Sequence, residues 1–378
     1  MTTTTRPLNI AHVIHHLVIG GMENGVVNLI NRLPRERFRH VVICIEDYSD
    51  FRQRIEREDV EVHALHRSKS GIWGMRWKLF TLLRRLKPDI VHTRNMSGLD
   101  ALLPARLSGI KTVHSEHGFD VDNLRGRATR PALLRRLHSP LVHRYVTVSE
   151  DLRRLMSEQW GVAASRVTQI YNGVDTERFS PTTPRRHELL PQALQGAGLF
   201  VIGAVGRVQP IKDQATLLRA FAAVLERRPE WRARLRLVLV GDGPLLTPLK
   251  SLAQELGIAP LAWFAGARHD VPDLLQAMDL FVLPSLMEGV SNTVLEAMAT
   301  GIPVLATAVG GNVELLDEGV VGSTFTPGDA GALAAMIETY ADNAELCARH
   351  GAAARQRAMQ RFSLQAMVAN YQDVYEAL

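Results

Sequence analysis

The residues best suited to chemistry lie in residues 283–304, where two glutamates flank the start of a predicted helix. Ser291 is placed to cap this helix, which we expect to continue to about Thr300. Glu288 precedes the helix, and Glu296 lies about one and a half turns inside it. Because the two carboxylates cannot share one helix face, we expect them to contact different ends of one ligand.

The backbone at this helix start is a second candidate for binding. The N–H groups of Gly289, Val290, Ser291 and Asn292 would have no partner inside the helix, and such groups suit hydroxyls or an anion. The alternative is an ordinary capped helix with two incidental glutamates. That alternative leaves the small residues around Glu288 unexplained.

Two cations follow the first predicted strand of the second half. Arg207 stands directly after Gly206, and Lys212 comes five residues later. A guanidinium fork and an ammonium group that converge at a strand end suit a diphosphate. Negative charge grows on the distal phosphate as a sugar departs, so two fixed cations there would stabilise the transition state more than the ground state. The alternative is a pair of surface cations in a loop.

The first half offers a glycine loop and a histidine. Gly20 and Gly21 lie between a predicted strand and a predicted helix. Without Cβ atoms, this backbone can approach a phosphate or an acceptor closely. The spacing is not the dinucleotide-binding fingerprint, so an ordinary tight turn is the alternative. His117 lies just past another predicted strand.

Two patterns point to other chemistry, and we expect neither to apply. Asp120 and Asp122 have the spacing of an Asp-x-Asp metal motif, but that motif is short and common by chance, so we expect no metal there. Glu288 and Glu296 could suggest a glycosidase, which needs two carboxyl groups about one bond. Their placement on a loop and on a helix makes that role awkward.

Alternating strands and helices must position these residues. Short apolar strands alternate with helical patterns, which indicates parallel sheets covered on both faces. The expected strands are 8–14, 40–45, 60–65, 90–93, 112–115 and 145–148, then 200–205, 235–240, 261–264, 280–283 and 303–307. Ligands of such sheets bind beyond the carboxyl ends of the strands, so two facing sheets would place the site in the cleft between them.

A cluster of Pro, Gly and polar residues around 180–198 separates the two series. We therefore expect an α/β protein with two Rossmann-like, doubly wound domains, residues 1–180 and residues 181–361. Residues 362–378 form an amphipathic helical pattern. This helix is expected to pack against a domain surface, with the first domain as the candidate.

Composition and length bound the class of protein. The 378 residues suit two domains, and 46% hydrophobic with 22% charged residues is typical of a globular chain. Two cysteines, Cys44 and Cys347, exclude a disulfide framework and a Cys-rich zinc site, and they fit a reducing compartment. No apolar run approaches the roughly 18 residues of a membrane-spanning helix, and the threonine-rich start does not match a signal peptide. We expect a cytoplasmic protein.

The charge is unevenly distributed. Residues 1–180 carry 28 Lys and Arg against 19 Asp and Glu, a net charge of +9, whereas residues 181–378 carry 16 against 20, a net charge of −4. A basic half is compatible with nucleic acid, an anionic membrane surface or phosphorylated substrates. No aromatic residues are interleaved as in single-stranded nucleic-acid binders, so we expect no nucleic-acid partner. A solvated basic face without a partner is the alternative.

The ordered set of motifs resembles the family 4 glycosyltransferases, which are retaining, nucleotide-sugar-dependent enzymes of the GT-B fold. Its centre is the pair Glu288 and Glu296, followed by Gly301 and Pro303. The resemblance covers nearly the whole chain and adds, in order, residues 19–23, 115–118, 148–150, 172–175, 206–207, 212–213, 241–244 and 310–315. The glycine loop and residues 116–118 look closest to the subgroup of bacterial exopolysaccharide assembly (PEP-CTERM/EpsH-type systems).

The resemblance implies a role for each candidate residue. Arg207 and Lys212 would stabilise the departing diphosphate of the donor. Glu296 would accept hydrogen bonds from both ribose hydroxyls, and Glu288 would lie at the sugar end of the donor. His117 would approach the donor sugar from the first domain, which would be the acceptor side.

Further donor contacts are implied at backbone positions. The amides of Gly289, Val290 and Ser291 would hold sugar hydroxyls, and Gly20 and Gly21 would complete donor binding. A front-face displacement, in which the leaving phosphate helps to deprotonate the acceptor, is favoured over a covalent glutamate intermediate. No cofactor and no essential metal are expected.

The sequence therefore predicts a retaining glycosyltransferase. It would move a sugar from a UDP- or GDP-sugar to a lipid-linked or growing glycan acceptor in bacterial exopolysaccharide synthesis. Acceptors on polyprenyl diphosphate lie at an anionic membrane surface, which would explain the basic half and predicts peripheral association with the inner face of the cytoplasmic membrane. The alternatives are a nucleotide-sugar epimerase or hydrolase of the same fold and a polyanion-binding protein.

Overall fold

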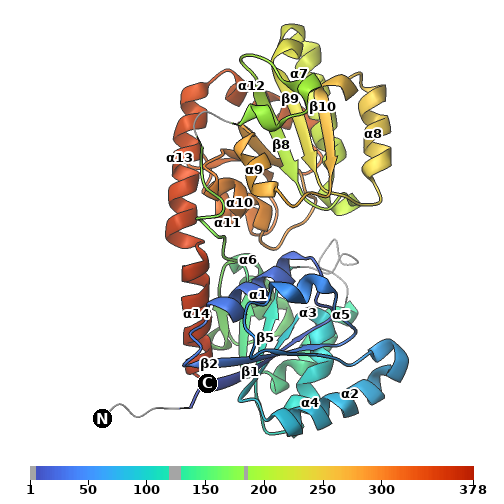
Figure 1. Ribbon diagram of the computed structural model, residues 1–378, viewed down its shortest axis with the longest axis vertical. Coiled ribbons are helices and arrows are strands. Elements are labelled where there is room, and N and C mark those ends of the chain that lie inside the picture. The colour runs from blue at the N-terminus through green and yellow to red at the C-terminus, as the bar shows by residue number, and fades with distance from the viewer. Residues whose placement is uncertain (1–5, 119–128, 183–185) are drawn as a thin grey trace. The chain divides into compact units, whose positions relative to one another are not determined.

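The chain forms two compact α/β units, each built on a parallel sheet (Figure 1). The computed structural model describes residues 6–118, 129–182 and 186–378. The first unit comprises residues 1–172 and 364–378, and the second comprises residues 173–363. All strand pairs are parallel, and each sheet is covered by helices, as the alternating apolar pattern predicts.

The first unit holds a seven-stranded sheet in the order β3-β2-β1-β4-β5-β6-β7. Its strands are β1 (Leu8–Ile14), β2 (Phe38–Cys44), β3 (Glu61–Ala64), β4 (Ile90–Arg94), β5 (Lys111–Glu116), β6 (Arg144–Thr147) and β7 (Val167–Gln169). Its helices are α1 (Gly21–Arg32), α2 (Arg67–Leu86), α3 (Asn95–Gly98), α4 (Leu102–Leu107), α5 (Thr129–His138), α6 (Glu150–Trp160) and α14 (Leu364–Glu376).

The second unit holds a six-stranded sheet in the order β10-β9-β8-β11-β12-β13. Its strands are β8 (Phe200–Val205), β9 (Leu235–Val240), β10 (Ala262–Gly266), β11 (Leu280–Leu283), β12 (Val304–Thr307) and β13 (Gly322–Phe325). Its helices are α7 (Gln214–Arg227), α8 (Leu246–Glu255), α9 (Val271–Gln276), α10 (Asn292–Ala299), α11 (Asn312–Leu316), α12 (Ala330–Ala341) and α13 (Ala344–Arg361).

Both sheets begin with the strand order 3-2-1-4-5-6 of a doubly wound fold. β4, β9 and β11 are buried along their whole length, as expected for strands covered by helices on both faces. β11 is an unbroken apolar run, whereas β9 includes Arg236 and β4 ends in His92, Thr93 and Arg94. The strand order reverses beside the first strand of each sheet, so the topological switch points lie between β1 and β4 and between β8 and β11. The carboxyl ends of these strands are where such sheets bind ligands.

The last helix belongs to the first unit. Apolar residues of α14 are buried in a core with strands β1, β4, β5 and β6, namely Leu364, Met367, Val368, Tyr371, Val374 and Tyr375. Figure 1 shows this helix beside the labelled strands of that unit. The chain thus begins and ends in the same unit.

The division between the units falls at residues 172–173, upstream of the position at 180–181 that the Pro and Gly cluster indicates. Backbone hydrogen bonding explains the difference. The N–H of Val174 donates to the carbonyl of Phe362 at 2.8 Å, and Arg355 donates to the carbonyl of Phe179 at 2.8 Å. Residues 173–180 are therefore attached to the second unit. Among the helices of the described residues, none is long and apolar enough to cross a membrane.

Candidate functional site

The second unit brings two predicted motifs to one edge of its sheet. β8 and β11 are hydrogen-bonded neighbours, although two strands and three helices separate them in sequence. Arg207 follows β8, and Glu288 follows β11. The topology thus places both motifs at the edge where doubly wound sheets bind ligands.

Lys212 and Glu288 form an ion pair in which the ammonium group donates to Oε1 of Glu288. The same oxygen accepts a 2.7 Å hydrogen bond from Oγ of Ser285. The N–H of Leu286 donates to the carbonyl of Ile211 at 2.8 Å, which joins the two loops. The Lys212 and Glu288 side chains are 21% and 11% exposed, so a ligand can reach this pair.

Arg207 is exposed, and its guanidinium has no hydrogen-bond or ion-pair partner among the described residues. Its backbone is nevertheless fixed, because its carbonyl accepts a 3.1 Å bond from Gln214 and the next N–H, of Val208, donates to the carbonyl of Asp242 at 2.9 Å. A Cβ on Gly243 would lie 2.3 Å from the carbonyl oxygen of Val208, so this close approach needs glycine. The backbone of the Arg207 loop is therefore fixed, whereas the Arg207 guanidinium remains available to a ligand.

Two glycines support the Glu288 loop. The N–H of Gly311 donates to the carbonyl of Gly289 at 2.8 Å. A Cβ on Gly310 would lie 1.9 Å from the carbonyl oxygen of Glu288, and a Cβ on Gly311 would lie 2.2 Å from that of Gly289. Any larger residue would displace the loop, so these glycines fix where the carboxylate lies.

Glu296 lies on α10 and is half-buried. Ser291 caps this helix as predicted, since its Oγ accepts a 3.4 Å bond from the N–H of Val294. Burial raises the pKa of Glu296 to about 7, although the charge of Arg178 opposes the shift. Within the described chain the Glu296 carboxyl group has no hydrogen-bond partner, so it can accept bonds from ligand hydroxyls.

The candidate residues of the first half also lie at the carboxyl edge of their sheet. Gly20 is the N-cap of α1 and contributes no capping side chain, and Gly21 is the first residue of that helix. The carboxylate of Glu23 turns back over this start, because a Cβ on Gly20 would lie 2.2 Å from its Oε2. An acidic group therefore already lies at this helix N-terminus, where negative charge is stabilised.

His117 follows β5, and its backbone N–H donates to Oδ1 of Asn95 at 2.9 Å. Both ring nitrogens are buried, and neither has a hydrogen-bond partner in the part of the chain that the structure describes. Burial lowers the pKa of His117 to about 3, and the nearby charge of Arg94 adds to the shift. The ring is therefore neutral near pH 7 and suited to a hydrogen bond with a hydroxyl or an oxyanion.

The structure thus brings Lys212 and Glu288 into contact, leaves Arg207 and Glu296 open, and places His117, Gly20 and Gly21 in the other unit. Asp120 and Asp122 lie outside the described residues. Within residues 6–118, 129–182 and 186–378, no three His, Cys, Asp or Glu side chains are grouped as metal ligands would be.

Sequence reasoning missed two polar residues at these edges. Ser285 supports Glu288, and Arg94 lies beside His117. Their positions in the sequence could have identified them as site residues, because each is a polar residue at or just after the carboxyl end of a predicted strand.

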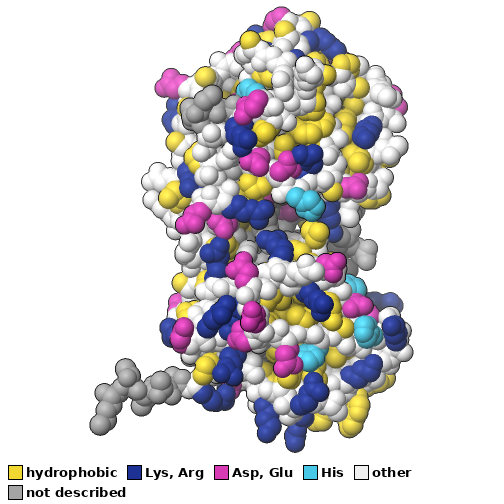
Figure 2. Space-filling view, viewed as in Figure 1, with side chains coloured by type: hydrophobic (Ala, Val, Ile, Leu, Met, Phe, Trp, Pro, Cys, Tyr) yellow, Lys and Arg dark blue, Asp and Glu magenta, His cyan; other side chains and the backbone are white. Residues whose placement is uncertain are grey.

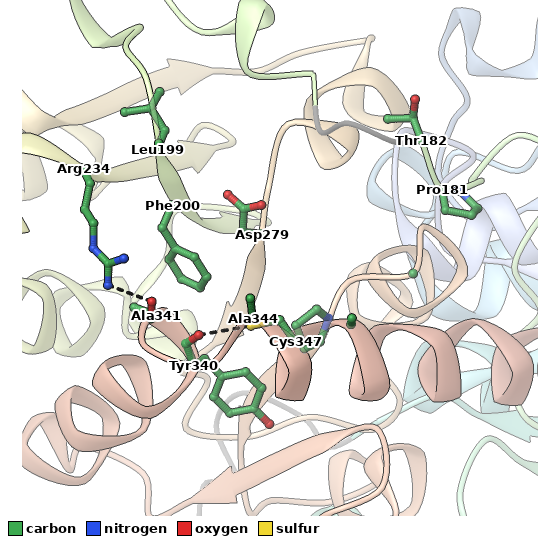
Figure 3. A pocket seen from close by; sticks show the side chains of 14 residues that line it. Pro181, Thr182, Leu199, Phe200, Arg234, Asp279, Tyr340, Ala341, Ala344 and Cys347 are labelled. Carbon is green, nitrogen blue, oxygen red and sulfur yellow. Dashed lines mark hydrogen bonds between the residues drawn. The ribbon is translucent and has the colours of Figure 1, made fainter.

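A pocket of about 560 Å³ lies elsewhere in the second unit (Figure 3). It is lined at the amino ends of the strands, by Phe200 of β8, Asp279 before β11 and Pro303 before β12. Arg234 and Cys347 also line it. This pocket is at the opposite edge of the sheet from Arg207 and is not the predicted donor site.

Two doubly wound parallel sheets in one chain are the architecture of the GT-B fold, which solved structures of glycosyltransferases share. Residues 19–178 match the family described as "Glycosyltransferase Family 4", and residues 200–343 match "Glycosyl transferases group 1". The chain belongs to the family 4 glycosyltransferases of GT-B fold.

Curated relatives include the Escherichia coli UDP-Gal:alpha-D-GlcNAc-diphosphoundecaprenol alpha-1,3-galactosyltransferase, 30% identical over 82% of this chain and 82% of that protein. The D-inositol 3-phosphate glycosyltransferase of Streptomyces coelicolor is 31% identical over 76% of this chain and 69% of that protein. The crystal structure of Anabaena Alr3699/HepE in complex with UDP has a similar fold, with a TM-score of 0.84 at 24% identity over 98% of this chain and 100% of that one.

Proposed function

We propose that this glycosyltransferase is a retaining enzyme that moves a sugar from a UDP- or GDP-sugar to a lipid-linked or growing glycan acceptor in bacterial exopolysaccharide synthesis. The observation that carries the proposal is the open Arg207 on the loop joined to the Lys212–Glu288 pair, at the carboxyl edge of the second sheet. The E. coli relative is named for a UDP-Gal donor and a diphospholipid acceptor.

The donor's diphosphate would bind to Arg207 and Lys212. When it draws the ammonium group of Lys212 toward itself, Glu288 loses a partner and can accept a hydrogen bond from a sugar hydroxyl. Ser285 would keep the carboxylate in place through its 2.7 Å bond. Glu296, with no bond from a described residue, would accept the ribose hydroxyls.

Chemistry would follow from the two cations. As the glycosidic bond to the donor phosphate breaks, charge develops on the diphosphate, and Arg207 with Lys212 stabilises it. The leaving phosphate would help to remove the acceptor's proton on the same face, so the sugar keeps its anomeric configuration. We propose that no cofactor or metal takes part. The contact of His117 with the donor sugar stays a prediction.

A lipid-linked acceptor would lie at a membrane, and α2 of the first unit carries side chains suited to a membrane surface. On α2 two tryptophans four residues apart are exposed, Trp73 by 73% and Trp77 by 68%. Basic residues lie on the same helix, among them Lys78, Arg84 and Arg85, and Figure 2 shows Lys and Arg side chains over the part of the first unit where α2 and α4 lie. Aromatic and basic side chains together suit the surface of an anionic membrane. We propose peripheral contact at the inner face of the cytoplasmic membrane.

The experiment is a nucleotide-release assay with UDP- and GDP-sugars, run with and without a sugar–diphospholipid acceptor. A transferase should release nucleotide much faster when the acceptor is present, and the product should retain the donor's anomeric configuration. Equal release without acceptor would indicate a hydrolase instead, and conversion of the donor without release would indicate an epimerase. A thermal-shift panel of nucleotides would identify the base, because ligand binding raises the melting temperature.

A further inference from the structure

Arg355 of α13 joins two segments that carry residues of the second unit's candidate site. Its Nη1 donates to the carbonyl of Ala299 at 2.6 Å and to the carbonyl of Phe179 at 2.8 Å. Ala299 is the last residue of α10 and lies about one turn beyond Glu296. Phe179 follows Arg178 directly. Both acceptors are backbone groups, so one side chain fixes the position of two segments.

The end of α10 needs a hydrogen-bond donor from outside the helix. The last carbonyls of a helix have no partner within it, and the residue four positions after Ala299 is Pro303, which has no N–H. The N–H of Thr300 already donates to the carbonyl of Glu296 at 3.0 Å. A cation is favoured at a helix C-terminus. Arg355 therefore closes the helical turn that carries Glu296.

α13 approaches this turn closely, and Figure 1 shows the helix beside α10. Gly351 and Arg355 are four residues apart on α13, so they lie on one face of it. A Cβ on Gly351 would lie 2.5 Å from the carbonyl oxygen of Gly301, so the close approach needs glycine. This backbone contact sets the distance across which the Arg355 side chain reaches the end of α10.

The second acceptor, the carbonyl of Phe179, brings Arg178 to the same place. The N–H of Arg178 donates to Oδ1 of Asp175 at 3.0 Å, and the N–H of Phe179 donates to the carbonyl of Asp175 at 2.9 Å. Burial raises the pKa of Glu296 and the charge of Arg178 opposes that shift, so the guanidinium lies near the carboxyl group. Arg355 thus fixes both the carboxyl group and the cation beside it.

We propose that Arg355 is a positioning residue of the donor site. It places Glu296 for a hydrogen bond with the ribose 2′-hydroxyl and so makes the protein prefer ribonucleotides to 2′-deoxyribonucleotides. The proposal rests on the proposed function, in which Glu296 accepts the ribose hydroxyls. Arg355 acts through the last turn of α10. The alternative is an arginine that only stabilises the packing of α13 on the second unit.

The test compares the affinity of UDP with that of 2′-deoxy-UDP, and the affinity of GDP with that of 2′-deoxy-GDP, by calorimetry on the full chain. The wild type should bind one ribonucleotide about tenfold more tightly than its deoxy analogue, since the analogue lacks a hydrogen bond to a carboxylate. Arg355→Met should reduce this preference to about threefold or less, because the turn that carries Glu296 is no longer held. A purely structural arginine would leave the preference unchanged, even if both nucleotides bound more weakly.

A double variant tests whether Arg355 acts through Glu296. Glu296→Ala alone should remove most of the preference, and adding Arg355→Met should reduce it no further. Arg357→Met is the matched control, because this arginine of the same helix donates to the carbonyls of Glu314 and Leu315 of α11 instead. The control should lower the melting temperature and keep the preference of the wild type.

Arg355→Lys serves if the methionine variant does not fold. Its ammonium group lacks the guanidinium fork, so the preference should fall by about twofold to threefold. An unchanged preference in the Arg355 variants, while Glu296→Ala lowers it, would overturn this inference and leave the proposed function standing. Equal binding of a ribonucleotide and its deoxy analogue by the wild type would also overturn it. A wild type that binds neither UDP nor GDP would overturn the inference and the proposed function together.

Discussion

Lys212 and Glu288 are joined by a charge-assisted hydrogen bond, although 76 positions separate them in the sequence. The ammonium group that should hold the donor's diphosphate is therefore shared with a carboxylate before any ligand arrives. Arg207, without a partner among the described residues, is the cation that can make the first contact. We therefore expect Arg207 to bind the diphosphate first and Lys212 to bind it only when its bond to Glu288 is given up.

Glu288→Gln tests whether Glu288 and the donor's diphosphate compete for the ammonium group of Lys212. The amide keeps the shape of the side chain but releases the charge of Lys212, so UDP should bind several-fold more tightly, while transfer from the nucleotide-sugar should slow by about tenfold. Calorimetry and steady-state rates measure the two effects. Glu338→Gln, which disturbs an exposed pair with Arg227, is the control and should change neither. Weaker UDP binding in Glu288→Gln would show that the pair does not compete with the diphosphate.

Arg207→Ala should slow turnover by about tenfold or more, because charge-assisted bonds to the diphosphate are lost. The melting temperature should stay at the wild-type value, since the guanidinium makes no hydrogen bond or ion pair with a described residue. Arg219→Ala on α7 removes another exposed arginine and should leave the rate unchanged. A wild-type rate in Arg207→Ala would remove this residue from the mechanism.

Glu296 should make stability depend on pH. Its pKa is raised from 4.5 to about 7 in the folded protein, so between these values the folded state binds more protons than the unfolded state. Its contribution is therefore fully present below pH 4.5 and is lost as pH rises to about 7. Thermal unfolding of the wild type and of Glu296→Gln across this range should show a difference that grows with pH and then levels off. Parallel curves would mean that the carboxyl group is not shifted.

Trp73 and Trp77 should contribute to membrane contact. Replacing both by Ala should reduce flotation with anionic liposomes at low salt, and high salt should reduce binding of the wild type as well. Val313→Ala removes an exposed apolar side chain from the second unit and serves as the control. Absence of wild-type binding to anionic liposomes at low salt would reject the membrane proposal.

Chelator treatment should leave transfer activity largely intact, because the proposed charge stabilisation comes from Arg207 and Lys212. The measurement is the rate before and after removal of divalent cations, with readdition as the control. A complete loss that readdition restores would make Asp120 and Asp122 metal-ligand candidates again.

The sequence by itself determined most of the elements, the fold class and the edge on which the motifs lie. Buried parallel strands such as β11 are continuous apolar runs, and Ser291 with Gly301 marks the ends of α10 by local rules. Two short edge strands, β7 and β13, were missed. β13 begins at Gly322, whose missing Cβ allows the carbonyl oxygen of Val304 to approach, and this contact cannot be seen in a local pattern.

Only the tertiary structure decided which distant residues meet. The pairing of Lys212 with Glu288 depends on β8 lying beside β11, and the burial of Arg94 depends on α14 closing over strands from the other end of the chain. Apolar periodicity indicates that a residue lies on a strand or a helix, but it does not indicate which other strand lies beside that strand in the sheet. Partners, burial and pKa shifts follow from that neighbour, so they became visible only in the folded chain.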